Sequence, residues 1–193
     1  VPDEGKLTYR GYDVKDLVRN AQSEDRFGYE EVAYLLITGF LPTKGELYDF
    51  RQRIADFRFL DREYVYEFPM PTQSTSIMNV LQRAVLMLYA FDANPDTTDP
   101  EHEIDVAASL IARLPRIAAI AHMTHLAEME GREAHIPSPV PSYSVAETVL
   151  QVLRGGDDFT RDEAMTLDVM LMLHAEHGGG NNSTFACRVL SSS

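Results

Sequence analysis

Apolar residues recur along this chain at the three- and four-residue spacing of amphipathic helices, whereas the two-residue alternation of strands is scarce. Four segments of the first half carry this spacing, and residues typical of helix ends flank them. They are the segment after Asp13, the segment from about Tyr29 to Gly39, the segment after the capping box of Thr43 and Glu46, and the segment from Met78 to about Asp92. Each of them is predicted to be a helix.

A fifth helix is predicted to begin at Asp99 and Pro100, because proline suits the first position of a helix. Apolar residues continue from there at helical spacing past Pro115. A proline inside a helix lacks the N–H that would bond to the preceding turn. We therefore expect the helix to kink or to restart at this residue.

The last third of the chain contains a loop and two further helix starts. Residues 131–142 include three prolines and are predicted to be extended. Capping boxes begin at Ser144 and Thr160, and the glycines at 155–156 separate the two helices that they predict.

The last complete helix carries Ala164, Leu167, Leu171 and His174 at positions i, i+3, i+7 and i+10. This spacing predicts that His174 faces inward with the apolar residues, and that His177 extends the same face by one step. The chain has no internal repeat, no low-complexity tract and no linker long enough to require two domains. The predicted fold class is all-α.

Composition narrows the possible classes of protein. The 193 residues are 45% hydrophobic and 24% charged, which is typical of a soluble globular domain. No apolar run approaches the ~20 residues that cross a bilayer, and the first residues do not resemble a secretion signal. The single cysteine, Cys187, excludes an intramolecular disulfide and fits a reducing compartment. We therefore expect a cytoplasmic protein.

The formal net charge of −13 argues against nucleic acid and anionic membranes as partners. It also constrains any anionic substrate. Such a substrate needs positive groups that are concentrated locally or supplied from elsewhere.

The most informative chemistry lies at residues 174–183, where His174 and His177 precede three glycines and two asparagines. Histidines three residues apart share one face of a helix. Glycines let the backbone approach a ligand closely or adopt a positive φ. The segment is predicted to form a binding corner in which His177 donates to a carboxylate or carbonyl oxygen and His174 supports it. The alternative is an ordinary helix end followed by a loop.

Three other chemistries fit these residues less well. A zinc site could combine His174 and His177 with Cys187 or Glu176, but no full ligand set is identifiable. The HGGG tetrapeptide at 177–180 is similar to the oxyanion hole of lipases, yet the chain has no G-x-S-x-G nucleophile motif. The phosphate-loop pattern is also missing.

Six segments in consistent order together resemble the bacterial type of the citrate synthase family. They are residues 7–13 (LTYRGYD), 29–43 (YEEVAYLL followed by GFLPT), 77–83 (IMNVLQR), 114–119 (LPRIAA), 141–147 (PSYSVAE) and 174–185 (HAEHGGGNNSTF). The resemblance covers essentially the whole chain. It implies an almost entirely helical fold with a large and a small domain, of which residues 1–193 would be the N-terminal portion of the large domain, a fragment.

The resemblance also implies the function of the whole protein. The family condenses acetyl-CoA with oxaloacetate and water to citrate and CoA, at the entry to the tricarboxylic acid cycle, as homodimers that need no metal or organic cofactor. In this chain His177 matches the oxaloacetate-binding histidine, with His174 and Asn181 in supporting positions. The enol-stabilising histidine, the substrate arginines and the catalytic aspartate are expected outside this chain, so it holds no catalytic residue and should be inactive alone.

Three functions stay open at this point. One is the acyltransferase just described, including 2-methylcitrate synthase, which uses propionyl-CoA; the two acyl groups differ by one methylene, worth only ~1–3 kcal/mol of discrimination. The second is a non-catalytic helical module. The third is a metal-dependent helical enzyme that uses His174 and His177. For any of them, we expect Phe185, Val189 and Leu190 to leave apolar surface exposed in this chain.

Overall fold

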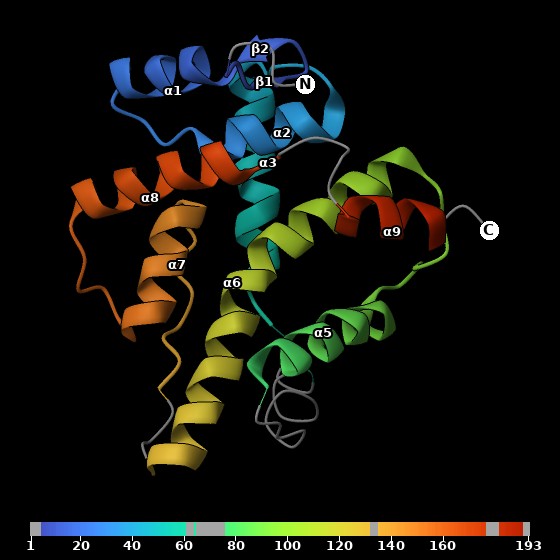
Figure 1. Ribbon diagram of the computed structural model, residues 1–193, viewed down its shortest axis with the longest axis vertical. Helices are drawn as coiled ribbons and strands as arrows, with labels where there is room; N and C mark the ends of the chain where they lie inside the picture. Colours follow the sequence, from blue (N-terminus) through green and yellow to red (C-terminus); the bar gives the residue numbers. More distant parts are fainter. Residues whose placement is uncertain (1–4, 61–63, 65–75, 132–134, 177–181, 191–193) are drawn as a thin grey trace.

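The chain folds into helices, in a computed structural model that describes residues 5–60, 64, 76–131, 135–176 and 182–190 (Figure 1). The helices are α1 (Val14–Ser23), α2 (Tyr29–Thr38), α3 (Lys44–Phe57), α5 (Ile77–Met87), the 3₁₀-helix η1 (Leu88–Phe91), α6 (Pro100–Glu130), α7 (Val145–Arg154), α8 (Arg161–His174) and α9 (Asn182–Leu190). The prediction of an all-α fold is confirmed.

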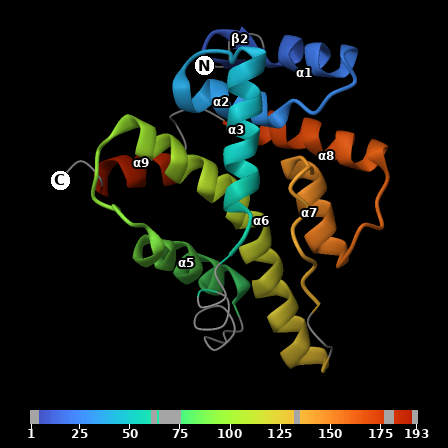
Figure 2. The ribbon, with the colours of Figure 1, turned by 180° about the vertical axis from the view of Figure 1, so that it is seen from behind.

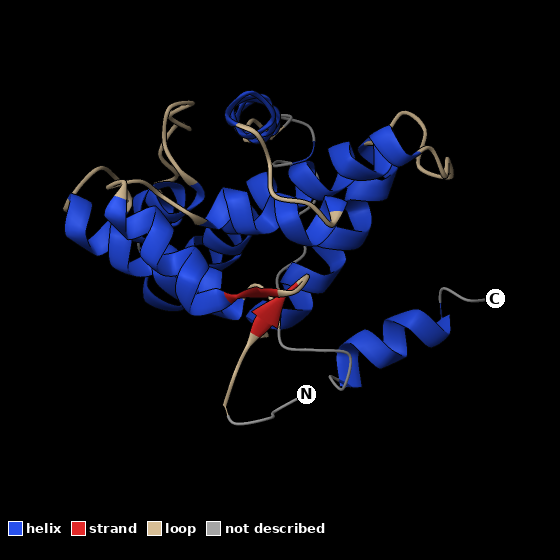
Figure 3. Ribbon diagram, turned by 90° about the horizontal axis from the view of Figure 1, so that it is seen from above, coloured by secondary structure: helices blue, strands red, loops and turns tan. Residues whose placement is uncertain are grey.

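A short antiparallel hairpin precedes α1, and the sequence pattern did not predict it. Its strands are β1 (Thr8–Tyr9) and β2 (Tyr12–Asp13), in which Thr8 pairs with Asp13 and Tyr9 with Tyr12. Figure 3 shows how small these strands are beside the helices. The hairpin matters because it holds one buried side chain, Tyr9, against the end of a distant helix.

The predicted helix starts are confirmed by local hydrogen bonds. The Asp13 carboxylate accepts a hydrogen bond from the Lys15 N–H at 2.9 Å at the start of α1. Complete capping boxes begin α3 at Thr43, α7 at Ser144 and α8 at Thr160. In each box the hydroxyl and the glutamate three residues later satisfy two backbone N–H groups that the helix itself leaves free.

The longest helix, α6, spans Pro115 without a break, so the predicted restart does not occur. Its direction changes along its length, as Figures 1 and 2 show. Helices α3, α5 and α7 all pack against α6. Ala108 and Ala112, before the proline, belong to the same buried cluster as residues of α3 and α7, and Ile117, after it, shares a cluster with α5. Tertiary packing of this kind outweighs the loss of one backbone hydrogen bond.

The described part of the chain contains three clusters of buried apolar residues. The first joins the hairpin, α1, α2 and α8; the second joins α2, α3, α6 and α7; the third joins Tyr64, α5, η1 and α6. Helix α2 contributes to two of the clusters, with Val32 and Leu35 in the first and Ala33 in the second. Through α2, the packing of α8 is coupled to that of α3 and α6.

Two predictions about apolar faces have different outcomes. In α5 the buried residues are Val80 and Ala84, whereas Met78, the apolar residue at which the predicted segment begins, is exposed. In α9 no residue is buried, and Phe185, Val189 and Leu190 are exposed as predicted. None of the described helices has the length and apolar composition that crossing a membrane requires.

Gly28, at the start of α2, packs so closely against α1 and α8 that no room is left for a side chain. A Cβ at this position would lie 2.8 Å from the Ala21 Cβ and 2.8 Å from the Met172 Sδ. Both neighbours are buried. Side-chain movement alone therefore cannot make room for a methyl group.

Gly28→Ala is expected to lower the free energy of unfolding by about 1–3 kcal/mol through overpacking. The matched control is Gly45→Ala in the first turn of α3, where the nearest atom to an added Cβ is 4.0 Å away. The control should raise stability by up to about 1 kcal/mol, because alanine restricts the unfolded chain. Urea unfolding followed by circular dichroism measures both; equal effects of the two substitutions would contradict the packing argument.

Candidate functional site

The candidate site begins at the C-terminal end of α8, which the structure describes as far as Glu176. His177 and Asn181 lie outside the described residues, and their predicted roles stay predictions. His174 is described. Its Nδ1 atom lies 2.8 Å from the Met170 carbonyl oxygen, one turn earlier in the same helix. Because a carbonyl oxygen only accepts hydrogen bonds, this contact requires the proton on Nδ1 and leaves Nε2 as an acceptor in the neutral ring.

The prediction that His174 faces inward is wrong, because its side chain is exposed. The buried residues of α8 are Ala164, Asp168 and Met172, at positions i, i+4 and i+8. This stripe is rotated from the predicted one, whose members Leu167 and Leu171 are only partly buried. The prediction failed because it aligned the inward face on Leu167 and Leu171, whereas the centre of the true face is the carboxylate of Asp168.

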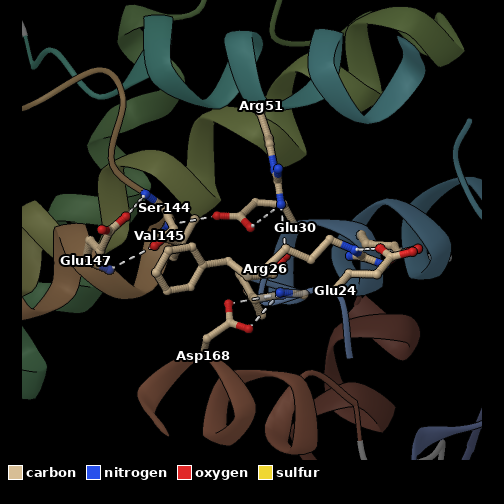
Figure 4. Close-up of polar contacts among 12 residues, drawn as sticks. Glu24, Arg26, Glu30, Arg51, Ser144, Val145, Glu147 and Asp168 are labelled. Atoms are coloured by element: carbon tan, nitrogen blue, oxygen red, sulfur yellow. Dashed lines mark hydrogen bonds and ion pairs between the residues drawn. The ribbon is translucent and has the colours of Figure 1, made fainter. Parts of the chain in front are cut away.

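Asp168 joins α8 to the start of α2. Its carboxylate accepts hydrogen bonds from the Gly28 N–H at 2.7 Å and the Tyr29 N–H at 3.1 Å (Figure 4). These N–H groups belong to the first turn of α2, which no residue inside that helix can satisfy. A negative charge at a helix N-terminus also interacts favourably with the helix dipole. Asp168, only 1% exposed, therefore caps a helix that lies 140 residues away in sequence.

Burial raises the pKa of Asp168 to about 6 from its ordinary value of 3.8. The hydrogen bonds from Gly28 and Tyr29 and the charge of Arg51 act in the opposite direction, and the neighbouring Glu30 adds to the increase. Removing the carboxylate from water therefore outweighs the two bonds that it accepts. The cap is positioned by packing, and its charge is costly to maintain there.

Glu30 makes the corresponding contact between α2 and α7. It is 2% exposed, and its Oε1 accepts a hydrogen bond from the Val145 N–H at 2.8 Å, at the first residue of α7 (Figure 4). Its other oxygen lies 3.6 Å from the Arg51 guanidinium on α3. Two buried carboxylates thus tie α8 to α2, and α2 to α7 and α3.

The end of α8 is held by Tyr9 from the hairpin. The Tyr9 hydroxyl donates to the Met172 carbonyl oxygen of this helix at 2.8 Å, and the carbonyl oxygens of Leu173 and Glu176 lie 3.1 Å and 3.3 Å from it. Tyr9 is 1% exposed and packs with Met172 in the first cluster. His177 follows Glu176 directly in the sequence. The last described residues before the predicted site are therefore fixed from outside their own helix.

Sequence reasoning did not identify Tyr9, Glu30 or Asp168 as residues that place the site. The available signal for Asp168 was its position four residues from both Ala164 and Met172, on the same helical face. Tyr9 and Glu30 both fall within segments of the family resemblance, at residues 7–13 and 29–43. Nothing in those segments indicates which distant backbone groups they contact.

Of the two histidines in the metal-site alternative, only His174 is among the described residues, so these residues do not test that alternative. Within this part of the chain, no three His, Cys, Asp or Glu side chains form a group that could hold a metal ion. Cys187 and His174 are both exposed.

The helical arrangement is that of a known class of enzyme. A solved citrate synthase from Pyrobaculum aerophilum matches 98% of this chain with a TM-score of 0.81 and 29% sequence identity, and the match covers 46% of that structure's chain. The family model described as "Citrate synthase, C-terminal domain" matches residues 1–193. The chain belongs to the citrate synthase family.

Curated relatives include both activities found in this family. In Corynebacterium glutamicum, 2-methylcitrate synthase 1 is 34% identical over 196 residues and citrate synthase is 32% identical over 195 residues. These alignments cover 100% and 98% of this chain, and 48% and 42% of the relatives. The chain thus spans about half the length of the curated relatives that it matches.

Asp168→Asn is expected to flatten the dependence of stability on pH between about 4 and 6. Because the pKa of Asp168 is higher in the folded state, the native protein binds more protons over this interval, and its stability falls as pH rises through it. Over the whole interval, the titration of Asp168 would change the free energy of unfolding by about 3 kcal/mol. A neutral asparagine keeps one acceptor oxygen and removes the titration.

The measurement is urea unfolding at pH 4, 5, 6 and 7, with the exposed Asp49→Asn substitution on α3 as the control. The control profile should run parallel to that of the unsubstituted chain. Parallel profiles for all three proteins would show that Asp168 is not the titrating group.

Proposed function

We propose that the protein containing this chain is a condensing acyltransferase that joins an acyl-CoA to oxaloacetate, with acetyl-CoA as the substrate and citrate and CoA as the products. The observation that carries the proposal is the segment HAEHGGGNNSTF at residues 174–185, in a chain that matches the family along its whole length. In this proposal the chain is the N-terminal portion of the large domain of a cytoplasmic homodimer, and the reaction needs no metal or organic cofactor.

His177 is proposed to bind oxaloacetate, with His174 and Asn181 in support. An imidazole can donate a hydrogen bond to a carboxylate or a carbonyl oxygen, and oxaloacetate has both. In the neutral ring, the bond from Nδ1 to Met170 leaves the Nε2 of His174 as an acceptor, which suits it for orienting a neighbouring donor. The catalytic histidine and aspartate and the substrate arginines are proposed to lie outside this chain.

The charge of the chain supports the proposal that the catalytic residues and the substrate arginines lie outside it. Oxaloacetate and CoA are anions, whereas this chain has a formal net charge of −13. Positive groups supplied by other parts of the protein would have to overcome this repulsion. The isolated chain is therefore proposed to be inactive.

The choice of acyl group is the finer question, and 2-methylcitrate synthase is the second candidate. A relative of each kind matches this chain at similar identity, 34% and 32%. A pocket distinguishes propionyl from acetyl by one methylene, worth about 1–3 kcal/mol. The residues that shape the acyl pocket are proposed to lie mostly beyond residue 193.

A full-length protein carrying this sequence should release free CoA thiol when oxaloacetate is added to acetyl-CoA, whereas residues 1–193 alone should not. A parallel series with propionyl-CoA identifies the preferred acyl group from the ratio of the two kcat/KM values. Turnover by the isolated chain would contradict the proposed division of residues. If neither protein turns over either substrate, the family member is a non-catalytic helical module.

His177→Ala in the full-length protein should lower kcat/KM for oxaloacetate by about 10- to 150-fold, because a hydrogen bond to a charged group contributes about 1.5–3 kcal/mol. The KM for the acyl-CoA should change little. The control is His122→Ala, an exposed histidine on α6. Steady-state kinetics with each substrate varied in turn tests this role, and unchanged oxaloacetate parameters for His177→Ala would refute it.

A further inference from the structure

A cavity of about 320 Å³ lies between α2, α3, the loop that leads into α7, and the start of α8. Three guanidinium groups line it: Arg51 on α3, Arg58 at the C-terminal end of α3, and Arg161 at the first position of α8. In a chain with a formal net charge of −13, such a concentration of positive side chains around one cavity calls for an explanation. The proposed function makes no use of these residues.

Arg58 is the most deeply buried of the three, at 2% exposed. Its Nη1 donates to the carbonyl oxygens of Val140 and Pro141, at 2.9 Å and 3.1 Å. Its Nε is buried without a hydrogen-bond partner, and no carboxylate of the described residues forms an ion pair with it. Burial lowers the pKa of Arg58, whereas Glu30 and Glu147 act in the opposite direction. A buried charge that lacks a partner is rare in proteins, because its removal from water is costly.

The two carboxylates in the wall of the cavity are engaged elsewhere (Figure 4). The Glu30 Oε1 accepts from the Val145 N–H at 2.8 Å, and its Oε2 lies 3.6 Å from the Arg51 guanidinium. The Glu147 Oε2 accepts from the Ser144 N–H at 2.7 Å. Both carboxylates therefore lie at the N-terminus of α7, where the helix dipole favours negative charge. They do not supply the missing partner of the buried guanidinium.

The other two guanidinium groups are accessible from solvent. The Arg51 side chain is 37% exposed and donates to the Phe27 carbonyl oxygen at 2.9 Å. The Arg161 side chain is 53% exposed and lies 3.3 Å from the Asp25 carboxylate, which is itself 83% exposed and screened by water. One buried cation and two accessible cations thus share the cavity. The hydroxyl-bearing side chains that also line it are Tyr48, Ser142, Tyr143 and Ser144.

A purely structural role for Arg58 can be judged against Arg116. Arg116 is 8% exposed, donates through Nη1 to the Pro137 carbonyl oxygen of the same loop at 2.8 Å, and also has a buried Nε without a partner. It is not among the residues that line this cavity. Holding the proline-rich loop accounts for the bonds of both arginines to carbonyl oxygens. It does not account for the placement of Arg58 against a cavity that two further cations line.

We infer that this cavity binds a phosphate group, either as the free ion or as the monoester of a small metabolite, with Arg58 as the principal contact and Arg51 and Arg161 as further contacts. Guanidinium groups match phosphate oxygens in geometry and charge, and hydroxyls complete such sites as donors. At roughly 30 Å³ for each non-hydrogen atom, the cavity has room for about ten of them, more than a phosphate ion alone requires. The inference concerns binding and does not depend on the proposed acyltransferase activity.

The experiment is isothermal titration of the full-length protein with inorganic phosphate, glycerol phosphate and malonate, at constant ionic strength. Arg58→Lys keeps the charge but removes the planar fork, and it should raise the Kd for the phosphate probes about 10- to 150-fold. The matched control, Arg116→Lys, makes the same change beside the same loop and should leave this Kd unaltered. Arg161→Gln, at an exposed position, should raise the Kd about two- to fivefold and tests the site even if Arg58→Lys does not fold.

Each result decides the inference. Tighter binding of glycerol phosphate than of phosphate would support it with a monoester as the ligand, and the reverse order would support it with the free ion. Equal Kd values in Arg58→Lys, Arg161→Gln and Arg116→Lys, or no binding of either phosphate probe by the unsubstituted protein, would overturn the site. Tighter binding of malonate than of both phosphate probes would overturn the assignment to phosphate.

Discussion

The arrangement of helices depends on one requirement, that the backbone N–H groups at buried helix starts find acceptors. Asp168 meets it for α2, and Glu30 on α2 meets it for α7. Helices α2, α7 and α8 are therefore connected in series by carboxylates that lie within the core. Each of these contacts has an exacting geometry, because an N–H group removed from water without an acceptor destabilises the fold by more than a formed bond stabilises it. Burial of the apolar clusters drives the helices to associate, and the carboxylates determine how the helices are aligned relative to one another.

Local sequence signals were enough to predict the helices themselves. The capping boxes at Thr43, Ser144 and Thr160 depend on residues within one turn of each other, and all three are present. Of the two outcomes predicted at Pro115, a kink or a restart, the restart does not occur, because α6 is supported by three neighbouring helices, which a local pattern does not contain. Similarly, the inward face of α8 was misplaced because Asp168 is buried by a contact with α2, and polar residues are ordinarily assigned to the surface.

The candidate site was predictable in part. Its segment stands out in the sequence through composition alone, and the resemblance to the citrate synthase family is confirmed over residues 1–193. His174 was correctly placed at the end of a helix but not on the correct face. The residues that hold this helix end, Tyr9 above all, could not be found in the same way. A tyrosine in a short hairpin carries no sequence signal for the carbonyls that it will meet.

The contact between Tyr9 and Met172 spans 163 residues, which affects the order in which the protein can be assembled. The hairpin and α1 leave the ribosome before α8, and their buried partner on α8 is made much later. At about 5–20 residues per second, the delay is roughly 10–30 s. Throughout that interval the apolar faces of α1 and α2 lack one of the helices that covers them. Synthesis of this chain therefore has a period of vulnerability to aggregation and proteolysis that ends only when α8 is complete.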